Sequence, residues 1–121
     1  MDMTTTSSSL QNVTDLDSFY GITQMDHLSV WFADAAWCGA CQRLRARYEE
    51  LALVYGPTVD FCRVDVDQAQ DLSQVLHVQQ LPSTFAFRKA AALDFPWPVG
   101  VPTASLAQYR EWIDKHAMTA A

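Results

Sequence analysis

Apolar positions along the chain recur at two spacings, which predict strands alternating with helices. Four runs of apolar or alternating residues are typical of strands: 10–13, 28–33, 59–66 and 84–87. Helices are expected in the segments that separate or follow them: about 14–22, 38–55, 67–77 and 103–116. With a fifth strand at 93–101, this order predicts an α/β domain. Its mixed five-stranded sheet is expected to be flanked by helices on both faces.

The segment 38–55 has the clearest helical pattern. Its apolar face is formed by residues at steps of four, three and four: Leu44, Tyr48, Leu51 and Tyr55. Gly56 and Pro57 follow, a pair that ends helices. Thr14 and Asp67 precede the two shorter helical segments, and both residue types favour the N-cap position. We therefore expect Thr14 and Asp67 to cap these helices.

Pro96 and Pro98 lie inside the expected fifth strand. A proline has no N–H to donate to a neighbouring strand, so a central position in the sheet is disfavoured. Because the two prolines are two residues apart, both missing donors fall on the same side of the backbone. The strand at 93–101 is therefore predicted to lie at an edge of the sheet, with this side facing water.

Composition narrows the class of protein. The 121 residues include 14 acidic and 8 basic side chains, a net charge of −6, which argues against binding nucleic acid. No run of 18 apolar residues is present, so no membrane span is expected. Residues 1–9 are polar and are predicted to be a flexible tail, with one folded domain at 10–121. Because the start of the chain lacks the pattern of a secretory signal, we expect a cytoplasmic protein. Separately, we expect the protein to be a monomer.

Three cysteines are present, and two of them, Cys38 and Cys41, are separated by two residues. This pair lies where a buried strand gives way to the long helix. The first turn of a helix offers unpaired N–H groups and partial positive charge, which stabilise a thiolate at Cys38. The thiolate is the nucleophile in disulfide exchange. Cys38 is therefore the expected attacking thiol, and Cys41, one turn away, the expected resolving thiol.

Several segments together resemble the thioredoxin family over about residues 10–117. They are Val13-Thr14-Asp15 with Ser18-Phe19, Trp37-Cys38-Gly39-Ala40-Cys41, Val64-Asp65-Val66-Asp67, Leu81-Pro82-Ser83-Thr84-Phe85 and Val99-Gly100-Val101. The resemblance implies the thioredoxin fold and the reduction of disulfide bonds in protein substrates. It also implies a separate reductase as electron donor, and no metal or other cofactor is expected.

The resemblance further implies a cis peptide bond between Leu81 and Pro82, beside the active-site turn. The backbone of Leu81 would there pair with an extended substrate strand. The expected substrate-contacting residues are Trp37, Gly39, Ala40, Leu81, Pro82 and Gly100.

Two departures from the family pattern affect the chemistry. Ala40 stands where thioredoxins usually have proline, so we expect a couple less reducing than about −270 mV by some tens of millivolts. Phe32 stands where the family has a buried acid that helps the second cysteine lose its proton, and Arg63 replaces the lysine partner of that acid. Asp34 would share a strand face with Phe32. We hypothesise that Asp34 accepts the proton of Cys41; the alternative is a solvated loop aspartate.

Other interpretations stay open at the level of sequence. Cys62 lies in an expected strand and is interpreted as an inert buried thiol. The hairpin glycine of the family is absent, so the turn near 89–92 is undetermined. The same two cysteines would also fit a binding module with little redox turnover, or a disulfide oxidase or isomerase.

Overall fold

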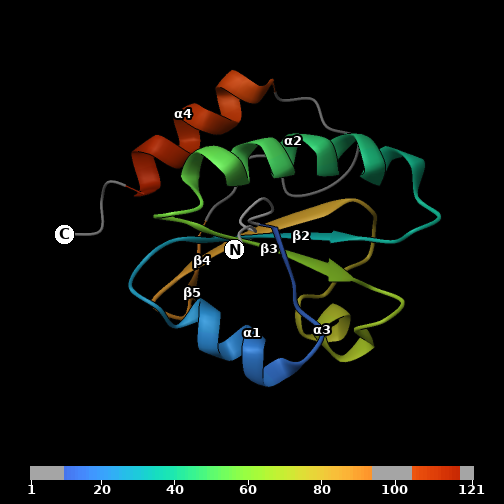
Figure 1. Cartoon of the computed structure of the whole chain (residues 1–121). Coiled ribbons are helices and arrows are strands. Elements are labelled where there is room, and N and C mark those ends of the chain that lie inside the picture. The colour runs from blue at the N-terminus through green and yellow to red at the C-terminus, as the bar shows by residue number, and fades with distance from the viewer. Residues whose placement is uncertain (1–9, 94–104, 118–121) are drawn as a thin grey trace, which may run out of the picture.

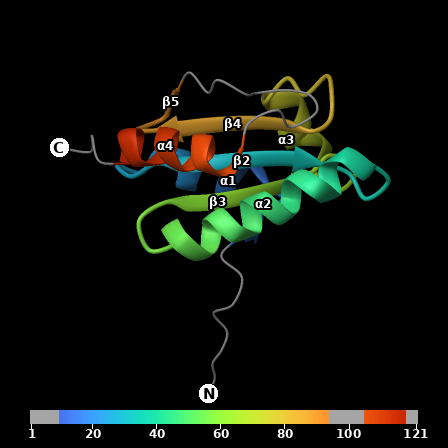
Figure 2. The same ribbon diagram turned by 90° about the horizontal axis from the view of Figure 1, so that it is seen from above.

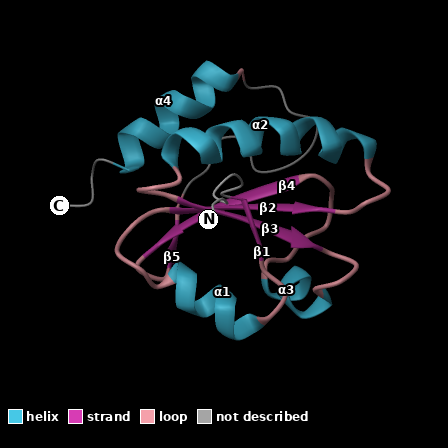
Figure 3. Cartoon of the chain, viewed as in Figure 1, coloured by secondary structure: helices cyan, strands magenta, loops and turns pink. Residues whose placement is uncertain are grey.

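The computed structural model describes residues 10–93 and 105–117. Over these residues, a five-stranded sheet lies between two layers of helices, with α2 and α4 on one face and α1 and α3 on the other (Figures 1 and 3). The elements are β1 (Leu10–Asn12), α1 (Leu16–Thr23), β2 (Ser29–Asp34), α2 (Gly39–Tyr55), β3 (Asp60–Asp65), α3 (Gln70–Val75), β4 (Ser83–Arg88), β5 (Ala91–Ala92) and α4 (Leu106–Ala117). The predicted α/β class, the order of elements and the flanking helices are confirmed.

The strands are ordered β1-β3-β2-β4-β5 across the sheet. β1, β3 and β2 run parallel, whereas β4 and β5 are antiparallel to their neighbours, so the sheet is mixed as predicted. Asp34 at the end of β2 pairs in register with Asp65 at the end of β3. α2 begins just beyond this edge of the sheet and lies next to α4 over the strands (Figure 2). The carboxyl ends of β2 and β3 therefore face the first turns of α2.

Alternate residues of the central strands separate the core into two halves. Val30 and Phe32 of β2 pack with Tyr48 of α2 on one face of the sheet, in a cluster that also contains Cys38 and Cys41. Trp31 points to the other face and packs against α1 and α3, as the period-two geometry of a strand requires. Trp31 is fully buried and belongs to the core.

Two predicted helix caps are wrong. α1 is capped by Asp15 rather than Thr14, because the Asp15 carboxylate accepts the Ser18 N–H at 2.9 Å. α3 begins only at Gln70, and its N-cap position makes no side-chain hydrogen bond. Asp67 instead accepts a hydrogen bond from the indole of Trp37, so a long-range partner takes the carboxylate that a local rule assigned to the helix.

The last strand begins earlier than the pattern predicted. β5 consists of Ala91 and Ala92 at the edge of the sheet, and Leu93 follows it. Pro96, Pro98 and Gly100 lie outside the described residues, so the proline-rich edge stays a prediction.

The turn between β4 and β5 uses two left-handed residues. Lys89 and Ala90 have φ angles of 52° and 65°, the pattern of a hairpin turn that usually contains glycine or asparagine. Their N–H groups donate to the carbonyl oxygens of Met25 and Thr23 at 2.9 and 2.8 Å. These bonds to the α1–β2 connection hold a turn that the local sequence disfavours.

Candidate active site

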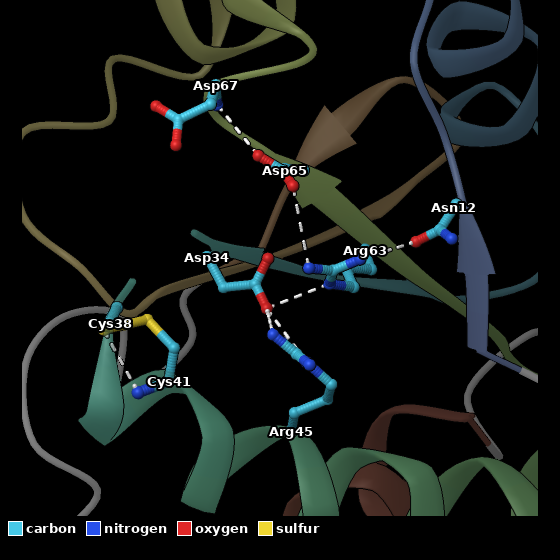
Figure 4. Close-up of polar contacts among 8 residues, drawn as sticks. All are labelled: Asn12, Asp34, Cys38, Cys41, Arg45, Arg63, Asp65 and Asp67. Carbon is cyan, nitrogen blue, oxygen red and sulfur yellow. Dashed lines mark hydrogen bonds and ion pairs between the residues drawn. A yellow bond between two sulfur atoms is a disulfide. The ribbon is translucent and has the colours of Figure 1, made fainter. Parts of the chain in front are cut away.

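Cys38 and Cys41 form a disulfide at the junction of β2 and α2, with their Cα atoms 5.3 Å apart (Figure 4). Cys38 is the N-cap of α2, and its sulfur accepts the Cys41 N–H at 3.1 Å. The Cys38 N–H in turn donates to the Ala35 carbonyl at 3.1 Å, which fixes the turn entering the helix. The sulfur of Cys38 therefore lies where helix N–H groups and the helix dipole favour negative charge.

The two sulfurs differ in their access to solvent. Cys38 is 8% exposed, whereas Cys41 is fully buried beneath the first turn of α2. Cys38 thus keeps a small exposed surface, and Cys41 has none. The order in which Cys38 attacks and Cys41 resolves stays a prediction.

The described substrate-contact candidates gather around this turn. Trp37 is 71% exposed, and its indole Nε1 donates to Asp67 at 3.0 Å. The Leu81–Pro82 peptide bond is cis, as predicted. Leu81 and Ala40 are half-buried against the cluster that contains both cysteines. Gly39 is exposed in the first turn of α2, and Gly100 lies outside the described residues.

Asp34 is a buried residue at the end of β2 with 0% exposure. Its Oδ2 accepts hydrogen bonds from Arg45 Nε at 3.0 Å, from Arg45 Nη2 and from Arg63 Nε at 2.9 Å (Figure 4). The alternative of a solvated loop aspartate is therefore wrong. The pairing with Arg63 places a buried acid and a cation together two residues beyond Phe32, on the same face of β2.

Arg45 was not among the predicted site residues and belonged to an arginine-rich stretch that resembles a solvated helix face. The structure buries most of its side chain, which is 27% exposed, against Asp34. One signal in the sequence would have indicated this contact. Arg45 follows Cys41 by four residues, so the two share a face of α2 that must point toward the sheet.

A chain of polar contacts continues from Asp34 to the exposed Trp37. Arg63 also approaches Asp65 at 3.8 Å and donates to Asn12 at 3.2 Å. Asp65 accepts the backbone N–H of Asp67 at 2.9 Å, and Asp67 holds the Trp37 indole. The segment from Trp37 to Arg45 is thus held at one end by Asp67, just after β3, and at the other by Asp34, at the end of β2.

Cys62 differs from the active-site pair. It lies in β3 among apolar side chains, is fully buried and forms no disulfide. Burial raises the pKa of its thiol far above the ordinary value, so the predicted inert thiol agrees with the structure.

Neither a metal site nor a membrane-crossing helix is found within 10–93 and 105–117. No three His, Cys, Asp or Glu side chains of these residues are grouped so that they could hold a metal ion. None of the helices in these segments combines the length and apolar character needed to cross a bilayer.

The fold and the paired cysteines at a helix N-terminus define a class, the dithiol proteins that exchange disulfides. Residues 13–109 match the family described as Thioredoxin, so the chain belongs to the thioredoxin family. This membership, together with the close cysteine pair, supports a thiol–disulfide oxidoreductase.

Individual relatives are similar over different lengths. A thioredoxin from Geodia cydonium is 36% identical over 91 residues, covering 75% of this chain and 81% of the relative. A thioredoxin from Borreliella burgdorferi is 43% identical over 49 residues, which is 40% of this chain and 42% of the relative. The alignment with Thioredoxin-1 of Caenorhabditis elegans covers 46% of that protein. The chain thus matches less than half the length of these last two relatives.

Solved structures show the same architecture. A thioredoxin from Malassezia sympodialis superimposes with a TM-score of 0.78 at 24% identity, covering 96% of this chain and 97% of the other. A thioredoxin from Trypanosoma brucei brucei gives a TM-score of 0.75 at 27% identity, covering 95% and 96%. The sheet order and the flanking helices are therefore those of the thioredoxin fold.

Proposed function

We propose that this protein reduces disulfide bonds in other proteins, with Cys38 as nucleophile and Cys41 as resolving thiol. The observation that carries the proposal is the difference between the two sulfurs. Cys38 is reachable and lies at the N-cap of α2, whereas Cys41 is sealed one turn away. Such a pair reacts with a bulky substrate through one sulfur and releases it through the other.

The reaction begins with the reduced pair. The Cys38 thiolate attacks one sulfur of the substrate disulfide, forms a mixed disulfide and releases the first substrate thiol. Cys41 then loses its proton, attacks Cys38 and releases the second substrate thiol. Two electrons pass to the substrate, whose two released sulfurs take up the equivalent of the Cys41 proton and one proton from solvent, and the Cys38–Cys41 disulfide seen in the structure remains. A separate reductase is proposed to return the two electrons.

The substrate is proposed to bind as an extended strand over Trp37, Gly39, Ala40, Leu81 and Pro82, with Gly100 beside them. Leu81 lies just before β4 and packs against the cluster that contains both cysteines. Its backbone is proposed to pair with the substrate by β-strand addition, in which main-chain hydrogen bonds give affinity without requiring a particular substrate sequence. The exposed indole of Trp37 adds apolar contact area.

Asp34 is proposed to accept the proton of Cys41. Its full burial and its place on the α2 side of β2 support this role, since Phe32 of the same strand face packs in the cluster that contains Cys41. General-base assistance of this kind contributes about 10²-fold or more to proton transfer. We further propose that the protein works as a cytoplasmic monomer.

Reduction of insulin by dithiothreitol, followed as turbidity, tests the proposal. The wild-type protein is expected to accelerate precipitation, and Cys38→Ser is expected to abolish the acceleration. Cys41→Ser should retain insulin as a mixed disulfide on Cys38, visible by mass spectrometry. A wild-type protein that leaves the insulin rate unchanged would favour a binding module and overturn the reductase assignment.

A further inference from the structure

The carboxylate of Asp34 is bound through one of its two oxygens. Arg45 and Arg63 both donate to Oδ2, whereas Oδ1 is buried and has no hydrogen-bond partner among the described residues. Figure 4 shows dashed lines from both guanidinium groups ending on Oδ2 and none ending on Oδ1. A buried acceptor without a partner is costly, so its presence in a buried polar cluster requires an explanation.

The position of Arg45 links this free oxygen to the cysteine pair. Arg45 and Cys41 are four residues apart on α2, so their side chains lie on the same face, about 6 Å apart along the axis. Arg45 reaches Asp34 from that face. Asp34 therefore lies under the first two turns of α2, in the layer that also contains the buried sulfur of Cys41.

We propose that Arg45, assisted by Arg63, is a positioning residue for the resolving step: it holds Asp34 by Oδ2 and leaves Oδ1 free to take the Cys41 proton. The transfer is direct or passes through one water bound at Oδ1. This inference rests on the proposed reductase function, and it assigns to two arginines a part in the second chemical step.

In the mixed disulfide, Cys38 is bonded to a substrate sulfur and Cys41 is a thiol. The Cys41 proton moves to Asp34 Oδ1, and the resulting thiolate forms the Cys38–Cys41 bond as the bond from Cys38 to the substrate breaks. The released substrate thiolate takes a proton, and Asp34 then loses the one that it received.

Arg45 fits the positioning role better than a lysine would. Its planar guanidinium donates to Oδ2 through both Nε and Nη2, which fixes the orientation of the carboxylate as well as its charge. Arg63 approaches from β3 and is shared with Asp65 and Asn12. Arg45 is therefore the member that ties the orientation of Asp34 to the helix carrying Cys41.

The test separates the two chemical steps in time. Reduced protein is mixed in stopped flow with one equivalent of dithionitrobenzoate, whose coloured thiol is released once by Cys38 and once by Cys41. The second phase is measured between pH 6 and pH 9 for wild type, Arg45→Met, Arg45→Lys and Asp34→Asn. Arg43→Met is the matched control, because Arg43 is an exposed arginine two residues away on the same helix. Thermal unfolding of each variant verifies that it is folded.

Arg45→Met is expected to slow the second phase about tenfold and to make it rise with hydroxide concentration, because bulk base replaces the positioned carboxylate. The first phase should stay within about twofold of wild type. Arg45→Lys keeps the positive charge but loses the planar guanidinium that donates through two nitrogens. We therefore expect an intermediate slowing of the second phase, by about threefold. Arg43→Met should match wild type. The double variant Arg45→Met with Asp34→Asn should be no slower than Asp34→Asn alone, since both changes act on one group.

Two results would overturn the inference. The first is a second phase in folded Arg45→Met or Arg45→Lys with the wild-type rate and pH profile. The second is an additive slowing in the double variant, which would mean that Arg45 acts independently of Asp34. Failure of the underlying reductase function gives a different signature, because the wild-type protein would then show both phases with the small disulfide and still not accelerate the reduction of insulin.

Discussion

Cys41 and Cys62 are both fully buried and lie on opposite faces of the same sheet. Cys41 is expected to react in disulfide exchange, whereas Cys62 is expected to be inert. Both have an exposed fraction of 0%. Cys41 lies in the first turn of α2, bonded to Cys38 and on the face that also carries Arg45. Cys62 lies in β3 among apolar side chains, where burial raises the pKa of its thiol. Burial alone therefore does not make a thiol inert; reactivity depends on the polar groups buried with it.

The largest expected effect is on turnover. Cys41→Ser should lower insulin reduction at least about 10³-fold, because the mixed disulfide then lacks its resolving thiol. Cys62→Ala should leave the rate within about twofold of wild type. A folded Cys62→Ala protein without activity would contradict the expectation that Cys62 is inert, since Cys62 would then take part in the reaction.

The next effect concerns stability. Asp34→Ala leaves two guanidinium groups without their shared carboxylate and should lower the free energy of unfolding by about 3 kcal/mol, the low end for a broken buried pair. Because both arginines are partly exposed, they can recover some hydration. Cys62→Ala removes only one sulfur atom from an apolar cluster and should cost about 1 kcal/mol. Urea unfolding of the oxidised proteins measures both values. An equal loss of free energy of unfolding in the two variants would contradict the expectation that the buried ion pair contributes more than Cys62.

The raised pKa of Cys62 predicts a dependence of stability on pH. Folding keeps this thiol protonated above its unfolded pKa of 9.0, so the unfolded state loses the proton first. The contribution of the Cys62 thiol to the free energy of unfolding is fully present below pH 9 and is lost as the pH rises above that value. The free energy of unfolding should therefore fall more steeply between pH 9 and pH 10.5 in wild type than in Cys62→Ala. Parallel profiles for the two proteins would show that Cys62 does not titrate differently on folding.

The smallest effect concerns the redox potential. Ala40→Pro fixes φ in the first turn of α2 and should move the couple toward more reducing values by some tens of millivolts. Equilibration with glutathione, read by mass spectrometry, compares the two proteins. A wild-type couple at or below about −270 mV would contradict the expectation drawn from Ala40.

The sequence predicted the elements and the reactive pair because both depend on local signals. The apolar periodicity of the helix at 38–55 and the two-residue spacing of the cysteines are visible within one segment, and α2 and its disulfide follow them closely. The cis bond before Pro82 came from the resemblance to the family. The interpretation of Asp34 as a strand residue on the same face as Phe32 also needed only the period of a strand.

The errors arose where a partner distant in sequence decides the structure. Asp67 has the side chain of an N-cap, but the Trp37 indole, thirty residues away, takes its carboxylate. Arg45 reads as part of a charged helix face, yet Asp34 lies opposite it and draws it inward. The turn at Lys89 and Ala90 is held by carbonyl groups of the α1–β2 connection. None of these three contacts is visible in a local window.

The central claim is that the helix N-terminus maintains a thiolate at Cys38, and the pH dependence of alkylation tests it most directly. Reduced Cys41→Ser protein is treated with iodoacetamide at a series of pH values, and the rate at Cys38 is followed by mass spectrometry. We expect a midpoint well below the value of about 8.5 for a free cysteine, with Cys62 unmodified throughout. A midpoint at or above that value in the folded protein would contradict it.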